Sequence, residues 1–225
     1  NITDKNYINR VTKGVYEFGS VFNTFTLAAG IHENVVEPET NFKNLEKSIT
    51  CGKNTIREYD KEIPSDLTAE QILIRSGNIG SVRIAQKIGL KKFSNFLNEL
   101  ELIDTIKFDI EEVGVPVSFR WGKCKLATSS YGHGITTTIL QLANAYSIIV
   151  NGGYKIRPTL IKKESKIKNK KILKNDVSKK INQILRKVVN SKEGTASLAN
   201  VNGYEVGGKT GTAQKSIAGG YSNKK

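Results

Sequence analysis

The sequence predicts a mixed α/β (α+β) fold in which helices outnumber strands. First, residues 21–29 are apolar almost all the way round, which is typical of a fully buried helix. Second, two Thr-x-x-Gln capping boxes, at Thr68 and Thr138, each open an apolar helical stretch. Third, strand-like patterns occur mainly in two segments, 154–161 and 201–214. A chain of 225 residues can bury one substantial core.

The predicted buried helix carries one hydroxyl, that of Ser20, at its N-terminal end. Gly19 lets the backbone turn, Ser20 is a favoured residue type at a helix N-terminus, and Gly30 is expected to end the helix. Free N–H groups and the positive end of the helix dipole favour an anion near the Ser20 oxygen. From this stretch alone, a buried helix with a capping serine is the favoured interpretation.

The middle of the chain is predicted to form a hairpin followed by three helices. The segment 32–60 is polar, and its residues 51–54 have the composition of a hairpin turn. Ser76-Gly77-Asn78 interrupts the helical pattern, and Gly89 ends it. The predicted helices are 67–75, 79–88 and 91–100.

The C-terminal half is predicted to alternate helices with strands, the second of which contains several glycines. Residues 104–130 have no regular pattern. The predicted elements are a helix at 138–150 closed by Gly152-Gly153, a strand at 154–161, a helix at 177–188 capped by Asp176, and a strand at 201–214.

The chain is basic, with 35 Lys and Arg against 21 Asp and Glu and a net charge of +14. Its lysines are densest between Lys162 and Lys180, where aromatic residues that could stack on bases are absent. We therefore expect a solvated lysine-rich linker and no nucleic-acid partner, with attraction to anionic lipid or wall polymer as a second interpretation. No stretch approaches the roughly 20 apolar residues of a membrane span.

Cys51 and Cys124 are the only cysteines. With two distant histidines they make a poor zinc site, and no metal is expected. Two unpaired loop thiols are favoured over a disulfide between them.

Three short motifs occur in a fixed order along the chain: Ser20-Val21-Phe22-Asn23, Ser76-Gly77-Asn78 and Lys209-Thr210-Gly211-Thr212. Ser-x-x-Lys, Ser-x-Asn and Lys-Thr-Gly, in this order, are signatures of penicillin-binding transpeptidases and serine β-lactamases. The chain resembles a class B penicillin-binding protein, specifically the septal peptidoglycan D,D-transpeptidase of cell division. One position departs from the pattern, because Asn23 stands where the first motif has lysine.

The resemblance implies a role for each motif residue. Ser20 is the acylated nucleophile, and Asn23 occupies the place of its lysine base, although a carboxamide cannot accept a proton near neutral pH. Ser76 relays a proton, and Asn78 positions the substrate amide. Lys209 supplies positive potential, Thr210 and Thr212 hold a carboxylate, Gly211 gives the substrate backbone room, and the backbone N–H groups of Ser20 and Thr212 form the oxyanion hole.

The resemblance also implies a reaction and a setting. Acyl transfer from D-Ala-D-Ala stem peptides would cross-link peptidoglycan during septal wall synthesis without any cofactor, and β-lactams would acylate the same serine. The implied fold is an antiparallel sheet flanked by helical clusters, incomplete here because residues 1–225 are expected to be a single transpeptidase domain truncated at both ends. The parent is expected at the periplasmic face of the inner membrane, anchored by a transmembrane helix outside this chain and associated with divisome membrane proteins.

Two other functions compete with this one, and a third, nucleotide binding, is rejected. A non-catalytic homologue that lost its lysine is consistent with Asn23, whereas a D,D-carboxypeptidase or β-lactamase lacks support from a recognisable deacylation glutamate. The segment 203–210 fits the phosphate-binding pattern G-x-x-x-x-G-K-[ST], but a buried strand before it and a helix after it are both missing from the sequence pattern.

His133, in Ser130-Tyr131-Gly132-His133-Gly134, is interpreted as a loop histidine hydrogen-bonded for structure.

Overall fold

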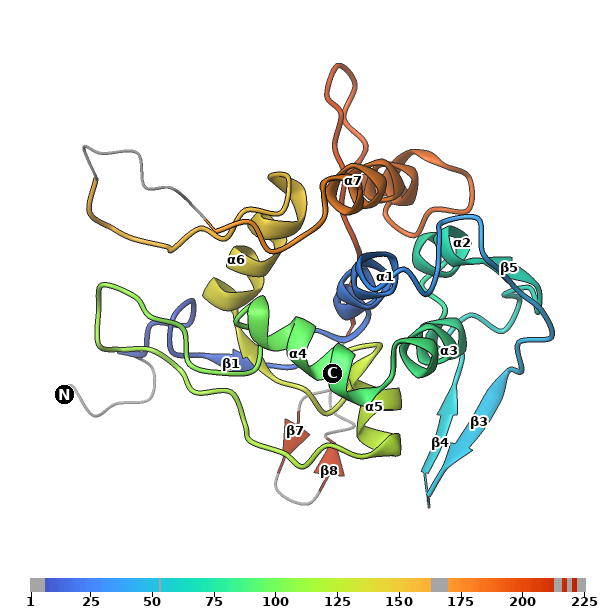
Figure 1. The fold of residues 1–225 in the computed structure, drawn as a ribbon, viewed down its shortest axis with the longest axis horizontal. Coiled ribbons are helices and arrows are strands. Elements are labelled where there is room, and N and C mark those ends of the chain that lie inside the picture. The colour runs from blue at the N-terminus through green and yellow to red at the C-terminus, as the bar shows by residue number, and fades with distance from the viewer. Residues whose placement is uncertain (1–6, 53, 163–169, 213–215, 218–219, 222–225) are drawn as a thin grey trace.

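A computed structural model describes residues 7–52, 54–162, 170–212, 216–217 and 220–221 of the chain. Helix α1 (Asn23–His32) lies at its centre, and the other long helices surround it (Figure 1). Every residue of α1 from Asn23 to Ile31 is buried, which confirms the predicted buried helix. These surrounding helices are α2 (Ala69–Ile74), α3 (Asn78–Ile88), α4 (Leu90–Glu99), α6 (Ile139–Val150) and α7 (Asn175–Asn190).

Both ends of the central helix differ from the prediction. Ser20 caps no helix through its side chain and lies instead in a 3-10 turn, η2 (Gly19–Phe22), that leads into α1. Gly30 does not end the helix, which continues to His32. A Cβ at Gly30 would lie 2.6 Å from a methyl of Val36 and 3.1 Å from one of Ile84, so the glycine serves close packing inside the core.

The helix boundaries that depend on capping chemistry are largely confirmed. Thr68 and Thr138 each form a complete capping box with the glutamine three residues later, at the start of α2 and α6. The predicted cap at Asp176 is wrong, because α7 begins at Asn175 and Asp176 lies in its first turn, paired with Lys180 at 2.9 Å. Part of the lysine-rich segment, 163–169, lies outside the described residues.

The described strands form antiparallel pairs and no larger sheet. The predicted strand at 154–161 is wrong, because this segment contributes a single bridge between Tyr154 and Lys171. No strand forms at 201–212 either, because no described strand lies beside it to share a ladder; residues 213 and 214 lie outside the described residues. The pairs are β1 (Val15–Tyr16) with β6 (Thr137–Thr138), β2 (Asn41–Phe42) with β5 (Leu67–Thr68), β3 (Ser48–Cys51) with β4 (Asn54–Arg57), and β7 (Ser216–Ile217) with β8 (Gly220–Tyr221).

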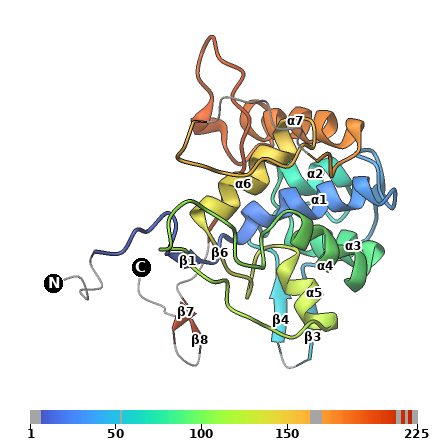
Figure 2. The same ribbon diagram turned by 60° about the vertical axis from the view of Figure 1, so that its left-hand side comes forward.

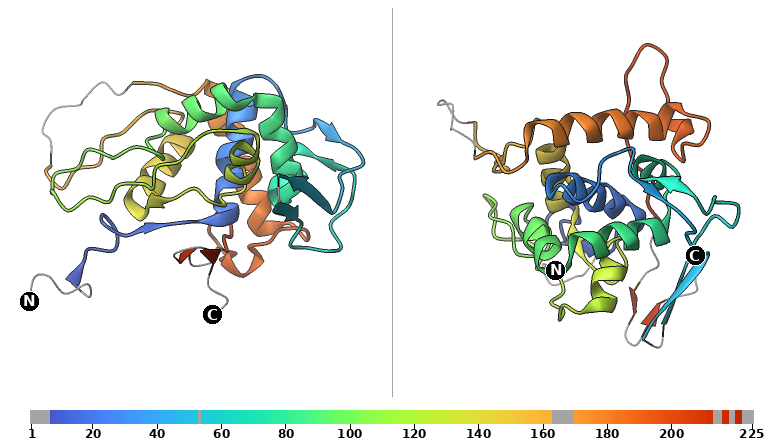
Figure 3. Two further views of the ribbon diagram at one scale, coloured as in Figure 1. Left: turned by 90° about the horizontal axis from the view of Figure 1, so that it is seen from below. Right: turned by 45° about the vertical axis from the view of Figure 1, so that its right-hand side comes forward.

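The β3–β4 hairpin projects on the side of the molecule opposite α7 (Figure 3, right). Its turn confirms the hairpin predicted at 51–54, with Gly52 at a φ of +60°. Part of the irregular segment predicted at 104–130 is in fact a helix, α5 (Lys123–Ser129), which lies alongside the hairpin (Figure 2).

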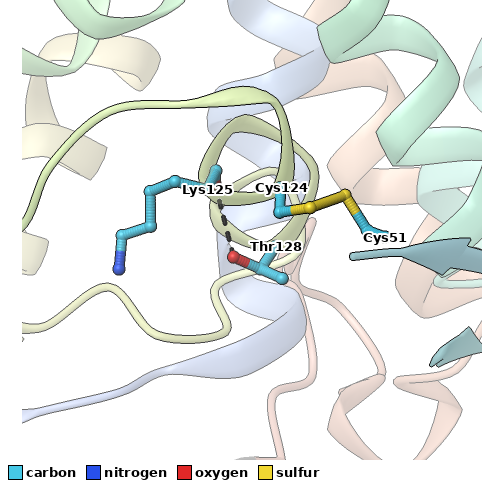
Figure 4. Close-up of a disulfide and its surroundings, with 4 residues drawn as sticks. All are labelled: Cys51, Cys124, Lys125 and Thr128. Atoms are coloured by element: carbon cyan, nitrogen blue, oxygen red, sulfur yellow. Dashed lines mark hydrogen bonds between the residues drawn. A yellow bond between two sulfur atoms is a disulfide. The ribbon is translucent and has the colours of Figure 1, made fainter. Parts of the chain in front are cut away.

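A disulfide joins the two cysteines, so the predicted pair of free thiols is wrong (Figure 4). Cys51 ends β3 and Cys124 lies in the first turn of α5, with their Cα atoms 5.4 Å apart. Packing of the hairpin against α5 brings the two together across 73 residues of sequence, a proximity that sequence spacing does not reveal.

Among the described residues, the structure contains no helix with the length and apolar character needed to cross a bilayer.

Candidate active site

Three chain segments meet backbone against backbone at the start of the central helix. A Cβ at Gly19 would lie 2.1 Å from the carbonyl oxygen of Thr212, and one at Gly132 would lie 2.1 Å from the carbonyl oxygen of Gly19. A Cβ at Gly211 would lie 2.5 Å from a methyl of Val21. Glycine at these positions therefore allows η2, the Tyr131–His133 loop and the Lys209–Thr212 segment to converge.

A cavity of about 920 Å³ opens where these segments meet. That volume lies within the usual range for small-molecule sites. Asn23 and Lys209, two of the predicted site residues, do not line it. The others do, so the structure brings residues from all three motifs to one place: Ser20, Ser76, Asn78, Thr210, Gly211 and Thr212.

Ser20 is half-buried at the wall of this cavity, in the turn that precedes α1. Asn23, three residues later, is 2% exposed, and neither its Oδ1 nor its Nδ2 has a hydrogen-bond partner among the described residues. A buried polar group without a partner costs about 1–3 kcal/mol. The position beneath Ser20 therefore holds a polar side chain that the surrounding core, as far as the structure describes it, does not satisfy.

Ser76 lies at the junction of α2 and α3 with a φ of +62°, a left-handed conformation that is rare outside glycine. Lys209 Nζ donates a hydrogen bond of 2.8 Å to Ser76 Oγ, and another of 2.9 Å to the carbonyl oxygen of Thr210. Burial lowers the pKa of Lys209 to about 8. The second and third motifs are thus in direct contact, and the amine between them is partly neutral slightly above neutral pH.

Asn78 begins α3 and is held firmly in place. Its Nδ2 donates to the carbonyl oxygen of Arg57 at 2.8 Å, and its backbone N–H donates to Glu58 Oε2 at 2.7 Å. Elsewhere in the lining of the cavity, Thr210 Oγ1 donates to Thr195 Oγ1 at 3.0 Å. Thr195 also lines the cavity and was not predicted from the sequence.

The Tyr131–His133 loop forms a further wall. The rings of Tyr131 and His133 stack at 6.0 Å, and His133 Nδ1 lies 3.8 Å from Oε2 of Glu17, which also accepts the backbone N–H of Gly134 at 3.0 Å. Burial, reinforced by the Glu17 charge, raises the pKa of Tyr131 to about 12. These contacts are compatible with the structural role predicted for His133, which stays a prediction.

The outer rim of the cavity is charged. The Arg75 guanidinium lies 3.5 Å from Asp60 on one side and 3.5 Å from Glu193 on the other, so it links the loop after β4 to the loop after α7. These residues have no motif of their own, and they are brought together only by the fold. No group of three or more His, Cys, Asp or Glu side chains in the described part of the chain could hold a metal ion.

The sequence matches the penicillin-binding protein transpeptidase domain family over residues 1–225. The chain therefore belongs to this family, and the resemblance to class B penicillin-binding proteins seen in the motifs is confirmed. Two solved structures also confirm the fold class. One is the apo transpeptidase domain of Burkholderia pseudomallei penicillin-binding protein 3, with a TM-score of 0.88, 27% identity, and coverage of 96% of this chain and 66% of that one. The other is a peptidoglycan glycosyltransferase from Burkholderia ambifaria, with a TM-score of 0.86, 27% identity, and coverage of 94% and 67%.

Curated relatives carry names of the same kind. A probable peptidoglycan D,D-transpeptidase FtsI from Caulobacter vibrioides is 32% identical over 218 residues, which are 95% of this chain and 36% of that protein. A probable peptidoglycan D,D-transpeptidase PenA from Neisseria flavescens is 30% identical over 220 residues, 96% of this chain and 54% of that protein. The chain thus spans about a third to a half of the length of these relatives.

Proposed function

We propose that this chain carries the acyl-transfer site of a septal peptidoglycan D,D-transpeptidase. The observation that carries the proposal is the convergence of three motifs on one cavity, with Ser20 at its wall and Lys209 hydrogen-bonded to Ser76. The names of the relatives, and FtsI in particular, support cross-linking of the septal wall. The substrates are D-Ala-D-Ala stem peptides, and β-lactams acylate the same serine.

The reaction proceeds in two acyl transfers. Ser20 Oγ attacks the carbonyl carbon between the two D-alanines, and the developing oxyanion is stabilised by the backbone N–H groups of Ser20 and Thr212. The bond to the terminal D-alanine breaks, and that amine leaves with a proton. An amine of a neighbouring stem peptide then attacks the acyl-enzyme and restores the serine. Asn78 positions the substrate amide, and Thr210 and Thr212 hold the substrate carboxylate. Gly211 leaves room for the substrate backbone.

The serine proton needs an acceptor other than Asn23. Ser76 Oγ takes it while passing its own proton to the neutral form of Lys209, whose pKa of about 8 makes this form available. This relay replaces a base directly beneath the nucleophile. We therefore expect acylation to be slow compared with a protein that has lysine at position 23.

Membership of the family also supports a proposal about the cellular location of the protein. We propose that the whole protein acts at the periplasmic face of the inner membrane, held there by a transmembrane helix and by divisome membrane proteins. Residues 1–225 supply a single, partial transpeptidase domain to it.

A non-catalytic penicillin-binding role is the second candidate, because the buried Asn23 side chain has no basic character and no partner in the described part of the chain. Incubating the full-length protein with a pentapeptide stem separates the two functions. Transpeptidation predicts release of D-alanine and cross-linked products, both abolished by Ser20→Ala. Stem binding in calorimetry without D-alanine release over many hours would instead establish the binding role.

A further inference from the structure

Glu58 lies just after β4 and outside the three motifs, yet it holds the start of α3. One carboxylate oxygen accepts the backbone N–H of Asn78 at 2.7 Å, and the other accepts that of Ile79 at 2.8 Å. The first N–H groups of a helix have no partner within the helix, and a carboxylate is well suited to them. Both oxygens of Glu58 are therefore engaged at the second motif.

The backbone around Glu58 strengthens this contact. The carbonyl oxygen of Arg57 accepts the Asn78 side-chain amide at 2.8 Å, and the Glu58 N–H donates to the carbonyl oxygen of Lys47 at 3.0 Å. Arg57 and Glu58 thus fix both the backbone and the side chain of Asn78. The β3–β4 hairpin that carries them is held at its other end by the disulfide to α5.

Ser76, two residues before Asn78, is in a conformation that needs such support. Its φ of +62° is a strained value for serine, and strained backbone persists only where neighbouring contacts hold it. Its hydroxyl must also stay within reach of Lys209 Nζ, 2.8 Å away. A shift of Asn78 would release the turn and move Ser76 away from Lys209.

We propose that Glu58 is a positioning residue that fixes Ser76 and Asn78 for acylation of Ser20. The inference rests on the proposed function and adds a residue to it. A carboxylate that merely stabilises α3 would affect folding alone, whereas a positioning carboxylate sets the rate of acylation in the folded protein. The two roles are separated by measuring rate and thermal stability on the same variants.

The test uses the full-length protein, in its natural form and with Asn23→Lys, and follows the binding constant and limiting rate of acylation by a fluorescent penicillin. Glu58→Ala is expected to lower the limiting rate about tenfold to a hundredfold, at a temperature where the thermal transition shows the variant folded. Glu58→Gln, which keeps one acceptor oxygen, is expected to give an intermediate rate. Glu62→Gln is the matched control, because it removes an exposed carboxylate from the same loop and should leave the rate unchanged.

Equal limiting rates for Glu58→Ala and the unmodified protein, with only a lower melting temperature, would overturn the inference. If Glu58→Ala does not fold, an unchanged rate in Glu58→Gln overturns it equally. If neither the unmodified protein nor the Asn23→Lys variant is labelled while Glu58 is intact, the proposed function is contradicted. The role of Glu58 in acylation is then contradicted as well.

Discussion

Asn23 stands where the first of the three motifs has lysine. Its side chain is buried one turn after Ser20, the proposed nucleophile, and both of its polar atoms are unpaired in the part of the chain that the structure describes. Asn23→Lys is expected to raise the rate of Ser20 acylation by a fluorescent penicillin roughly 100- to 10,000-fold, because it restores a general base. Stopped-flow or gel labelling gives the rates, with Ser20→Ala as the blank. Equal rates for the unmodified protein and the Asn23→Lys variant would mean that position 23 has no part in proton transfer.

Lys209 is expected to make binding and chemistry depend on pH in opposite directions. As pH rises through its pKa of about 8, the ammonium loses the charge that attracts the substrate carboxylate, so binding weakens. Over the same range the neutral amine becomes available to accept the proton passed by Ser76, so the limiting acylation rate rises. Separate measurement of the binding constant and the limiting rate from about two pH units below this pKa to about two above it checks both slopes.

Lys209→Arg is the matched variant, because an arginine keeps its charge throughout this range. It should bind with little dependence on pH and acylate slowly at every pH. Parallel pH profiles for the two proteins would show that Lys209 does not titrate in the reaction.

Thr212→Ala should weaken stem-peptide binding in calorimetry without changing these pH slopes.

At the scale of elements, the disulfide anchors the β3–β4 hairpin to α5. A crosslink across 73 residues restricts the unfolded chain and is expected to contribute about 4 kcal/mol to the free energy of unfolding. Denaturant titration of the full-length protein with and without reductant measures the difference. The double variant Cys51→Ser, Cys124→Ser should unfold like the reduced protein and be insensitive to reductant. Unchanged stability on reduction would show that hairpin packing alone holds these elements together.

Elements whose signals are local were predictable from the sequence. The capping boxes at Thr68 and Thr138 mark the true starts of α2 and α6, because a cap is made within four residues. The buried character of α1 was predictable from its composition, whereas Gly30 was misread because its packing against Val36 and Ile84 is tertiary. The strand predicted at 201–214 is absent from the described part of that segment, 201–212, for a related reason, since a strand exists only with a partner beside it.

In the candidate site, only residues that belong to a motif could be predicted from the sequence. Motif order predicts Ser20, Ser76 and Lys209 as site residues, and in the structure Ser20 and Ser76 line one cavity while Lys209 is hydrogen-bonded to Ser76. Arg75 and Thr195, which line the cavity, and Glu58, which contacts the backbone of Asn78, belong to no motif and could not be predicted, because only tertiary packing brings them there. The disulfide between cysteines 73 positions apart illustrates the same limit in the scaffold.

At the scale of the whole molecule, paired strands are scarce among the described residues and some apolar side chains are uncovered. Leu198 and Tyr204 are largely exposed, the second of them on the segment that the sequence pattern assigns to a strand. We predict that residues 1–225 expressed alone will aggregate or melt without cooperativity, because unpaired edges and apolar patches favour association. Size-exclusion chromatography and calorimetry test this against the full-length protein. A monodisperse, cooperatively melting chain would show that residues 1–225 suffice for a stable domain.

The central claim is that Ser20 is the nucleophile of a penicillin-binding acyl-transfer site. Mass spectrometry of the full-length protein after prolonged incubation with benzylpenicillin tests it most directly, with peptide mapping of any adduct. The expected result is one penicilloyl group per molecule, located on Ser20, formed slowly with Asn23 and rapidly with Asn23→Lys, and absent in Ser20→Ala. An adduct on another residue, or none in the Asn23→Lys protein with an intact fold, would contradict the account.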